Sequence, residues 1–120
     1  MEDESTIADT YYFSEKAIAG MKATKNSALM NKGRVQRLDQ PSNTVAAHLA
    51  KVSLNSTDPV LMINEKYRMY TPREVARIQS FPDSFRLVES KTRNYKVLGN
   101  AVAPVVMWHI TRSIVEAIKG

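Results

Sequence analysis

The chain has 120 residues, the length of one domain, and its 43% hydrophobic and 24% charged residues are typical of a folded protein rather than a disordered one. It contains no cysteine, which excludes disulfides, thiolate metal sites and a cysteine nucleophile from this chain. The net charge is +5, and the first ten residues hold four acidic residues and no Lys or Arg, so the rest of the chain is more basic than this value.

A basic body suits an anionic partner, most commonly nucleic acid, although a merely soluble basic surface has the same composition. The two histidines, His48 and His109, are too few and too far apart to indicate a metal site. No apolar run approaches transmembrane length, and the acidic N-terminus is unlike a signal peptide. We therefore expect a soluble, intracellular protein.

The first half of the chain predicts a helix, a loop and two strands. In FSEKAIAGMKATK, Ser14 is a suitable N-cap for a short helix. The polar stretch 26–43 predicts a loop with turns, and a β-like run begins at Thr44. After a second turn cluster, VLMI at 60–63 predicts a buried strand, and NEKYR at 64–68 returns the chain to the surface.

The segment YTPREVARIQSFPDSF carries the clearest local signal. Thr71 is a predicted helix N-cap, Pro72 occupies the first helical position, and Glu74 completes a capping box. We expect this helix to run to about Gln79 and to stop before Pro82, which cannot continue it.

The C-terminal segment predicts a long helix that starts near Val102 or Ala103, since Pro104 is tolerated only in the first turn. Its apolar residues at 102, 106, 110, 114 and 118 form a stripe that we expect to face a core. Just before it, the pair Gly99-Asn100 follows a short apolar run. The pair is either a plain strand-to-helix turn or a turn shaped to hold a ligand.

Two blocks in the C-terminal half resemble the end of DNA (cytosine-5) methyltransferases. The penultimate block of that family reads roughly R-x-L-T-P-R-E-x-A-R-L-Q-G-F-P-D-x-F. Residues 68–85 are similar to it, with mild departures that include Tyr70 at a usual Leu and Ser80 at a usual Gly. The last block reads Y-K-Q-x-G-N-A/S-V followed by a helix, and residues 95–102 resemble it. Residues upstream resemble the same family more weakly.

The resemblance implies an α/β fold of mixed helices and short strands. The chain would form the C-terminal portion of an S-adenosylmethionine-dependent methyltransferase fold with part of a small target-recognition domain. Residues 1–65 would belong to the DNA-binding recognition region, and residues 66–120 would return to the methyltransferase domain and complete its cofactor pocket. The implied activity is methylation of carbon 5 of cytosine in double-stranded DNA, within a restriction-modification system in the cytoplasm of a bacterium or phage host.

Chemistry limits what this chain does alone. Cytosine-5 methylation needs an enzyme thiolate that adds to carbon 6, and the family carries it in a Pro-Cys block. This chain has neither a cysteine nor a Gly-x-Gly cofactor loop, so we expect it to be inactive without a larger chain that supplies both. The resemblance places three residues beside S-adenosylmethionine, shared with that partner chain: Asn100, Ala101 and Val102.

The resemblance implies structural or DNA-contact roles for other residues. Four of them would organise and dock the recognition region: Arg68, Thr71, Pro72 and Glu74. For Arg68, a surface salt bridge is the alternative. Thr44 resembles the position whose hydroxyl meets a DNA phosphate. Further candidates for phosphates or base edges lie in two loops, where an ordinary solvated loop is the alternative: Arg34, Arg37, His48, Lys51 and Asn55.

Three accounts of the whole protein stay open. The chain is the small subunit of a split methyltransferase, an account that the initiating Met and the acidic leader favour. Alternatively, it is a C-terminal fragment of such an enzyme. In the third account it is a free-standing, non-catalytic DNA-binding or regulatory module derived from this family.

Overall fold

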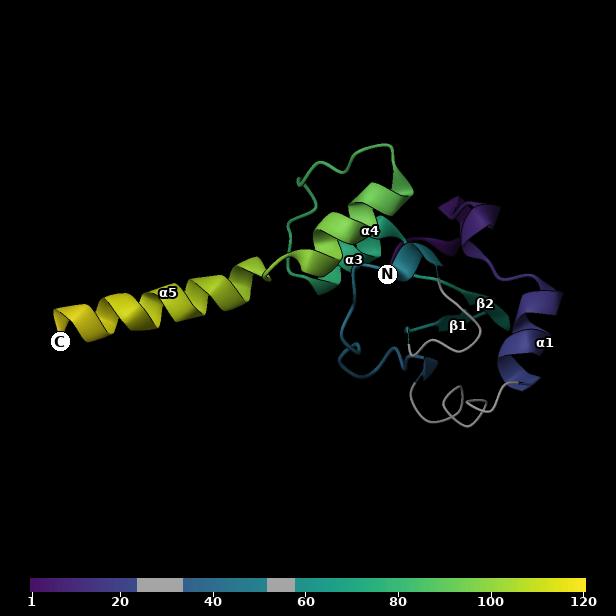
Figure 1. The fold of residues 1–120 in the computed structure, drawn as a ribbon, viewed down its shortest axis with the longest axis horizontal. Helices are drawn as coiled ribbons and strands as arrows, with labels where there is room; N and C mark the ends of the chain where they lie inside the picture. The colour runs from purple at the N-terminus through teal and green to yellow at the C-terminus, as the bar shows by residue number, and fades with distance from the viewer. Residues whose placement is uncertain (24–33, 52–57) are drawn as a thin grey trace.

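The computed structural model describes residues 1–23, 34–51 and 58–120. Figure 1 shows a packed body formed by most of the chain, from which one long helix projects. The elements in chain order are η1 (Glu4–Thr6), η2 (Asp9–Tyr11), α1 (Glu15–Ala23), η4 (Leu49–Lys51), β1 (Leu61–Ile63), β2 (Lys66–Arg68), α3 (Pro72–Ile78), α4 (Lys91–Asn100) and α5 (Pro104–Lys119). This mixture of helices and a small sheet fits an α/β fragment.

The strand predicted at 60–63 is confirmed as β1, which pairs antiparallel with β2. Its expected burial holds only in part: Val60 and Leu61 are buried, but Met62 is 48% exposed because alternate residues of a strand point to opposite faces. Asn64 and Glu65 form the turn between them with φ angles of 49° and 63°, a left-handed pair typical of tight hairpins. Single bridges extend the hairpin on both sides, from Tyr12 to β2 and from Val35 to the residue before β1. The N-terminal segment therefore joins the sheet.

Two expectations about strands need correction. Residues 64–66 are exposed, as expected, but the chain does not stay at the surface, because β2 pairs with β1 and Arg68 at its end is fully buried. Thr44 does not open a strand; the chain there is irregular and leads into η4. The hairpin edge is already bridged by Val35, and Val45 and Leu49 instead insert into the core.

The predicted helix after Thr71 is confirmed as α3, and both hydrogen bonds of the capping box are present. Its C-terminal end is a Schellman motif, in which the Ser80 N–H donates to Arg77 and the Phe81 N–H donates to Ala76. Ser80 has a φ of 62°, a conformation that glycine adopts without strain. The helix predicted after Ser14 is likewise confirmed as α1, and the Ser14 hydroxyl accepts the Ala17 N–H at 3.2 Å.

The expected turn at Gly99-Asn100 is wrong, because both residues lie in the last turn of α4. The preceding apolar residues form a helix, not a strand: Ser90 caps it, and Tyr95 and Leu98, three residues apart, face the core. The core joins α3, α4, β1 and the segment before η4. Its buried members are Val45, Leu49, Leu61, Tyr70, Val75, Ala76, Tyr95 and Leu98.

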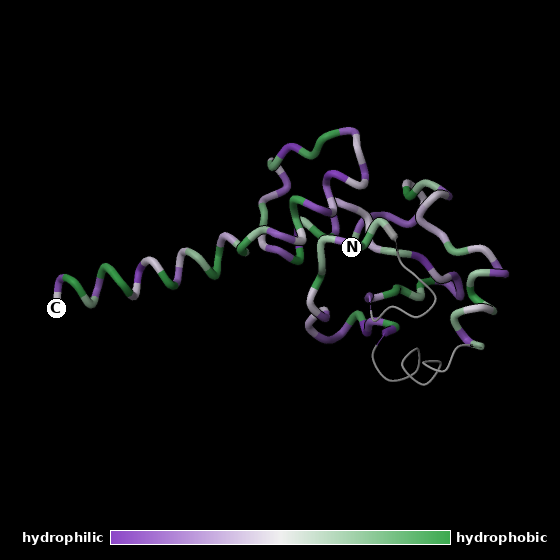
Figure 2. Tube along the Cα trace, in the orientation of Figure 1, coloured by the Kyte–Doolittle hydropathy of each residue, from purple (hydrophilic) through white to green (hydrophobic). Residues whose placement is uncertain are grey.

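Helix α5 starts at Pro104, close to the predicted start, but its apolar stripe does not face a core of this chain. Every residue of α5 is exposed, and the helix extends the molecule to 58 Å in its longest direction. Figure 2 shows apolar residues recurring along the whole projecting helix. The large exposed side chains of this helix include Trp108, which is 55% exposed. The stripe is present without anything in the described chain to cover it.

Within the described residues, the helical stretch Lys91–Lys119 meets a length-and-composition test for a membrane span, contrary to our expectation that no run would. A single such stretch is weak evidence, because core helices of soluble proteins pass the same test. The stretch also consists of two helices separated at residues 101–103, and α5 itself has 16 residues, fewer than the ~20 that a bilayer requires.

Candidate functional site

Gly99 brings two predicted parts of the site together. A Cβ atom added at Gly99 would lie 2.3 Å from the Ala47 nitrogen and 2.4 Å from the Ala46 carbonyl carbon. Both contacts are to backbone, which cannot swing aside, so only glycine permits this approach. The segment that bears Thr44 therefore runs directly against the end of α4, beside Asn100.

The three predicted cofactor residues form an open edge at the C-terminal end of α4. Asn100 and Val102 are exposed, Ala101 is half-buried, and the Asn100 amide makes no hydrogen bond within the described residues. Gln79, from the end of α3, holds this edge in place: its side-chain Nε2 donates to the Leu98 carbonyl at 2.9 Å and to the Ala101 carbonyl at 3.5 Å. The sequence signal for Gln79 was its place in the family block, but its contact with α4 was not predicted.

Ser80 connects this edge to α5. Its hydroxyl accepts the backbone N–H of Val105 at 3.1 Å. Pro104 has no N–H, and Ala103 provides no side-chain cap, so Ser80 supplies a cap for one of the free N–H groups at the start of α5. The serine thus holds the start of the projecting helix against the end of α3.

The predicted DNA-contact residues lie in different environments. Thr44 is exposed, and Arg37 is exposed and pairs with Asp39, its Nε donating at 3.0 Å. Arg34 is only 5% exposed and donates through Nε to the Asp58 carbonyl at 3.1 Å. Burial lowers the pKa of Arg34, and the nearby Asp58 charge partly opposes this. A contact of Arg34 with DNA would require the guanidinium to leave this position.

Other predicted loop residues give less information. His48 is exposed, and its Nε2 lies 3.0 Å from the Asp58 carboxylate. Lys51 ends η4, and its side chain lies outside the described part of the structure, as does the whole of Asn55. The DNA contacts proposed for these residues stay predictions.

Buried groups hold the segment before Thr44 from two sides. The Gln36 Oε1 accepts the Asn43 N–H at 2.7 Å, and its Nε2 donates to the Arg34 carbonyl at 3.2 Å. On the other side, the hydroxyls of Ser42 and Tyr70 lie 3.2 Å apart. Tyr70 and Gln36 are only 4% and 8% exposed. Sequence reasoning missed both contacts, and the one available signal was Tyr70 at a usual Leu.

Three of the four predicted docking residues, Arg68, Thr71 and Glu74, form one buried network with the acidic N-terminus, while Pro72 is the buried first residue of α3. The Arg68 guanidinium, with no exposed surface, pairs with Glu4 and donates to both carboxylate oxygens of Glu74, at 2.8 and 2.9 Å. Thr71 bonds to the carboxylate of Glu2. The surface salt bridge considered for Arg68 is therefore wrong, because the side chain is sealed beneath the N-terminal segment.

The charges in this network stabilise one another. Burial opposes the charge of Arg68, yet its hydrogen bonds to Glu74 and Glu4 outweigh burial and raise its pKa above the ordinary value. The hydrogen bond from Arg68 in turn lowers the pKa of Glu4, against the smaller effect of burial. The role of this arrangement is structural: it fixes the start of α3 and the N-terminal segment.

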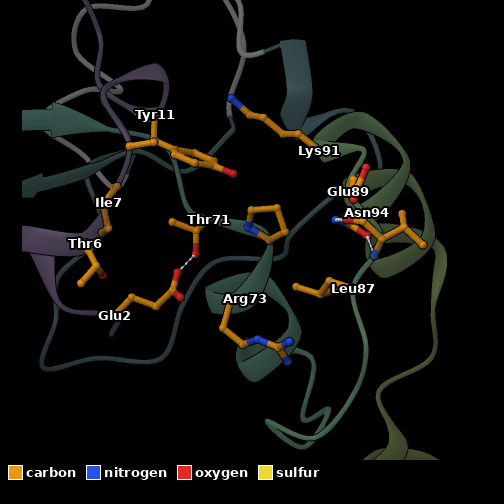
Figure 3. Close-up of a pocket in the computed structure, with 13 residues that line it drawn as sticks. Glu2, Thr6, Ile7, Tyr11, Thr71, Arg73, Leu87, Glu89, Lys91 and Asn94 are labelled. Carbon is orange, nitrogen blue, oxygen red and sulfur yellow. Dashed lines mark hydrogen bonds between the residues drawn. The ribbon is translucent and has the colours of Figure 1, made fainter.

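A hollow of about 330 Å³ lies beside this network, between the N-terminal segment, the start of α3 and the start of α4. Figure 3 shows Glu2 meeting Thr71 on one side, and Tyr11 and Lys91 together on another. The Lys91 ammonium sits 4.4 Å from the Tyr11 ring centre, and the Asn94 amide is bonded to both backbone groups of Val88. With most of its polar groups already paired, the hollow indicates a packing seam.

Comparison with known proteins decides the family. The model of the C-5 cytosine-specific DNA methylase family matches residues 2–116. The chain belongs to this family. Among relatives, this methylase chain is 36% identical over 82% of its length to the type II methyltransferase M.AgeI of Thalassovita gelatinovora, and 35% identical over 83% to M.Bpa9945I of Bacillus paralicheniformis. It is 32% identical over 97% of its length to M1.ScrFI of Lactococcus lactis subsp. cremoris.

The methylase chain spans only part of these relatives: 21% of M.AgeI, 22% of M.Bpa9945I and 31% of M1.ScrFI. The match confirms the family resemblance seen in the two C-terminal blocks. Two of the positions that depart from the family pattern, Tyr70 and Ser80, each make a side-chain hydrogen bond to a distant segment.

Proposed function

We propose that this chain is the C-terminal part, or the small subunit, of a DNA (cytosine-5) methyltransferase that modifies cytosine within a specific DNA sequence. The observation that carries the proposal is the backbone contact of Gly99 with Ala46 and Ala47. It places the segment that bears Thr44, a predicted phosphate contact, against the end of α4, where the predicted edge of the methyl-donor pocket begins. Methyl transfer to DNA requires these two functions side by side.

The edge at 100–102 fits one wall of a cofactor site. The Asn100 amide, which makes no hydrogen bond within the described residues, offers two donors and one acceptor oxygen, and the exposed Val102 offers apolar surface. S-adenosylmethionine, when bound, supplies the methyl group. In our proposal Asn100 binds and orients its polar groups, Ala101 and Val102 line one side, and Gln79 keeps this wall in position. The other walls come from a larger chain or from an N-terminal portion.

The same larger body supplies the cysteine nucleophile and covers α5. Several side chains of α5 are about half exposed, and Ile118 is 80% exposed. An amphipathic helix of this kind gains stability only when its apolar face is buried. We infer that α5 docks on the methyltransferase domain, that residues 1–65 belong to the recognition region, and that residues 66–120 complete the cofactor domain. The chain alone is then inactive, and the assembly acts in the cytoplasm on double-stranded DNA.

The test is reconstitution. Co-expression with a chain that carries a Pro-Cys block and a Gly-rich cofactor loop should yield transfer of labelled methyl groups to DNA, which neither chain achieves alone. If the mixture stays inactive while this chain binds DNA by itself, the free-standing module replaces our proposal.

Within an active assembly, Asn100→Ala should weaken S-adenosylmethionine binding more than DNA binding, because the amide faces the cofactor. Loss of one or two hydrogen bonds to the ligand corresponds to roughly a fivefold to thirtyfold rise in Kd. Thr92→Ala, an exposed change in the same helix, is the control. Unchanged cofactor affinity in Asn100→Ala would exclude the role assigned to this residue.

A further inference from the structure

The hydroxyl of Tyr70 occupies a position where the family pattern has leucine, and it reaches across to Ser42 at 3.2 Å. A leucine has no group that could make this contact. The two residues lie 28 positions apart in the sequence, so the bond ties the residue before the α3 cap to the segment before Thr44. Because the leucine of the family pattern cannot make this hydrogen bond, the bond is specific to this protein.

The phenol of Tyr70 is held rigidly. Its side chain is 4% exposed within the core, and its own carbonyl accepts the hydroxyl of the buried Tyr95. The Ser42 hydroxyl donates to the Asn43 carbonyl at 3.0 Å. Because a serine hydroxyl has one proton, Ser42 then accepts from Tyr70, and the Tyr70 hydroxyl is the donor in this pair.

Gln36 fixes the same segment from the opposite side, because its side-chain oxygen accepts the Asn43 N–H at 2.7 Å. Ser42 and Asn43 are therefore fixed by two nearly buried side chains, while Thr44 follows them into solvent. A threonine side chain is short and stiff at χ1, so the preceding backbone decides where its hydroxyl points.

We propose that Tyr70 is a positioning residue for DNA binding: through Ser42, it sets the backbone from which Thr44 meets a DNA phosphate. The inference rests on the proposed function and adds to it the group that places the phosphate contact. In this proposal Tyr70 acts on DNA through Thr44. Among the described residues, the Tyr70 hydroxyl is bonded to Ser42 and not to the edge at 100–102, so its removal should leave cofactor binding unchanged.

The test uses the assembled methyltransferase with the variants Tyr70→Phe and Ser42→Ala. Each removes one hydroxyl of the pair, and each should raise the Kd and KM for DNA about fivefold, the effect of one hydrogen bond. The KM for S-adenosylmethionine should stay unchanged. Tyr67→Phe removes the same hydroxyl group from the hairpin, away from this loop, and should leave all three constants unchanged.

Combination with Thr44→Ala separates positioning from general packing. If Tyr70 acts through Thr44, Tyr70→Phe should have no further effect on DNA affinity once Thr44 is replaced. A full additional fivefold loss in the double variant, or wild-type DNA affinity in Tyr70→Phe, would overturn the inference. If Tyr70→Phe fails to fold, Ser42→Ala in the partly exposed loop carries the same test. A wild-type assembly that neither binds DNA nor transfers methyl groups would instead refute the proposed function, and the inference with it.

Discussion

Replacing Arg68 by Met should destabilise this chain more than any other single change considered above. The guanidinium has no exposed surface, and it is the shared partner of Glu4 and of Glu74, which is 2% exposed. Methionine fills much of the same volume, but it leaves the buried Glu74 carboxylate without the charge that faces it. Breaking a buried pair by removing one partner costs about 3–5 kcal/mol of unfolding free energy.

The loss should be measured by urea denaturation of the full chain at pH 7, followed by circular dichroism. Arg68→Lys keeps the charge but loses the planar fork that serves both carboxylates, so it should recover only part of the stability. Arg77→Met is the matched control, since Arg77 is exposed and pairs with the exposed Asp83. If Arg68→Met proves as stable as Arg77→Met, the network does not stabilise the fold as we argue.

The pH dependence gives a second check on the same residue. The hydrogen bond from Arg68 lowers the pKa of Glu4 below its ordinary value of 4.5. A group with a lowered folded pKa contributes stability above its unfolded pKa, and this contribution is lost as the pH falls through the folded pKa. The stability gap between wild type and Arg68→Met should therefore be widest above about pH 4.5 and should narrow on acidification. A gap that widens at low pH would contradict this coupling.

Three further outcomes are expected. Gly99→Ala should lower the unfolding free energy by about 1–3 kcal/mol, because its Cβ overlaps the backbone of Ala47; wild-type stability in urea would contradict the contact. Ser80→Gly relieves a left-handed backbone at about 1 kcal/mol but also removes the cap of Val105 at a similar cost, so the unfolding free energy should change by less than about 1 kcal/mol; faster hydrogen exchange at the Val105 amide should report the lost cap, and unchanged exchange there would contradict it. Ile110→Asp should abolish co-purification with the larger chain without changing this chain's own melt, whereas Ser113→Asp, on the polar side of α5, should leave co-purification intact; equal capture of both variants would exclude docking through the apolar face of α5.

The sequence by itself determined the features that depend on neighbours along the chain. Thr71, Pro72 and Glu74 specify the start of α3 because a capping box closes within three residues. Pro104 likewise sets the start of α5. The two C-terminal blocks were also sufficient to predict the family, which the match over residues 2–116 confirms.

Only the tertiary structure decided how distant residues meet. The Gly99-Asn100 pair looked like a turn, but core packing of Tyr95 and Leu98 extends α4 through it, and the glycine serves instead to admit the backbone of Ala47. The N-terminal segment that bears Glu4 covers Arg68, and the sequence could not predict this burial because the two residues are 64 positions apart.

The last helix shows what the sequence pattern does not predict, namely which surface covers its apolar face. The periodic apolar residues of α5 indicate that one face of the helix must be buried, since exposed apolar surface is unfavourable in water. They do not state which surface provides it. Within the described residues the structure leaves that face uncovered, because the core forms from α3, α4, β1 and the segment before η4 without any residue of α5.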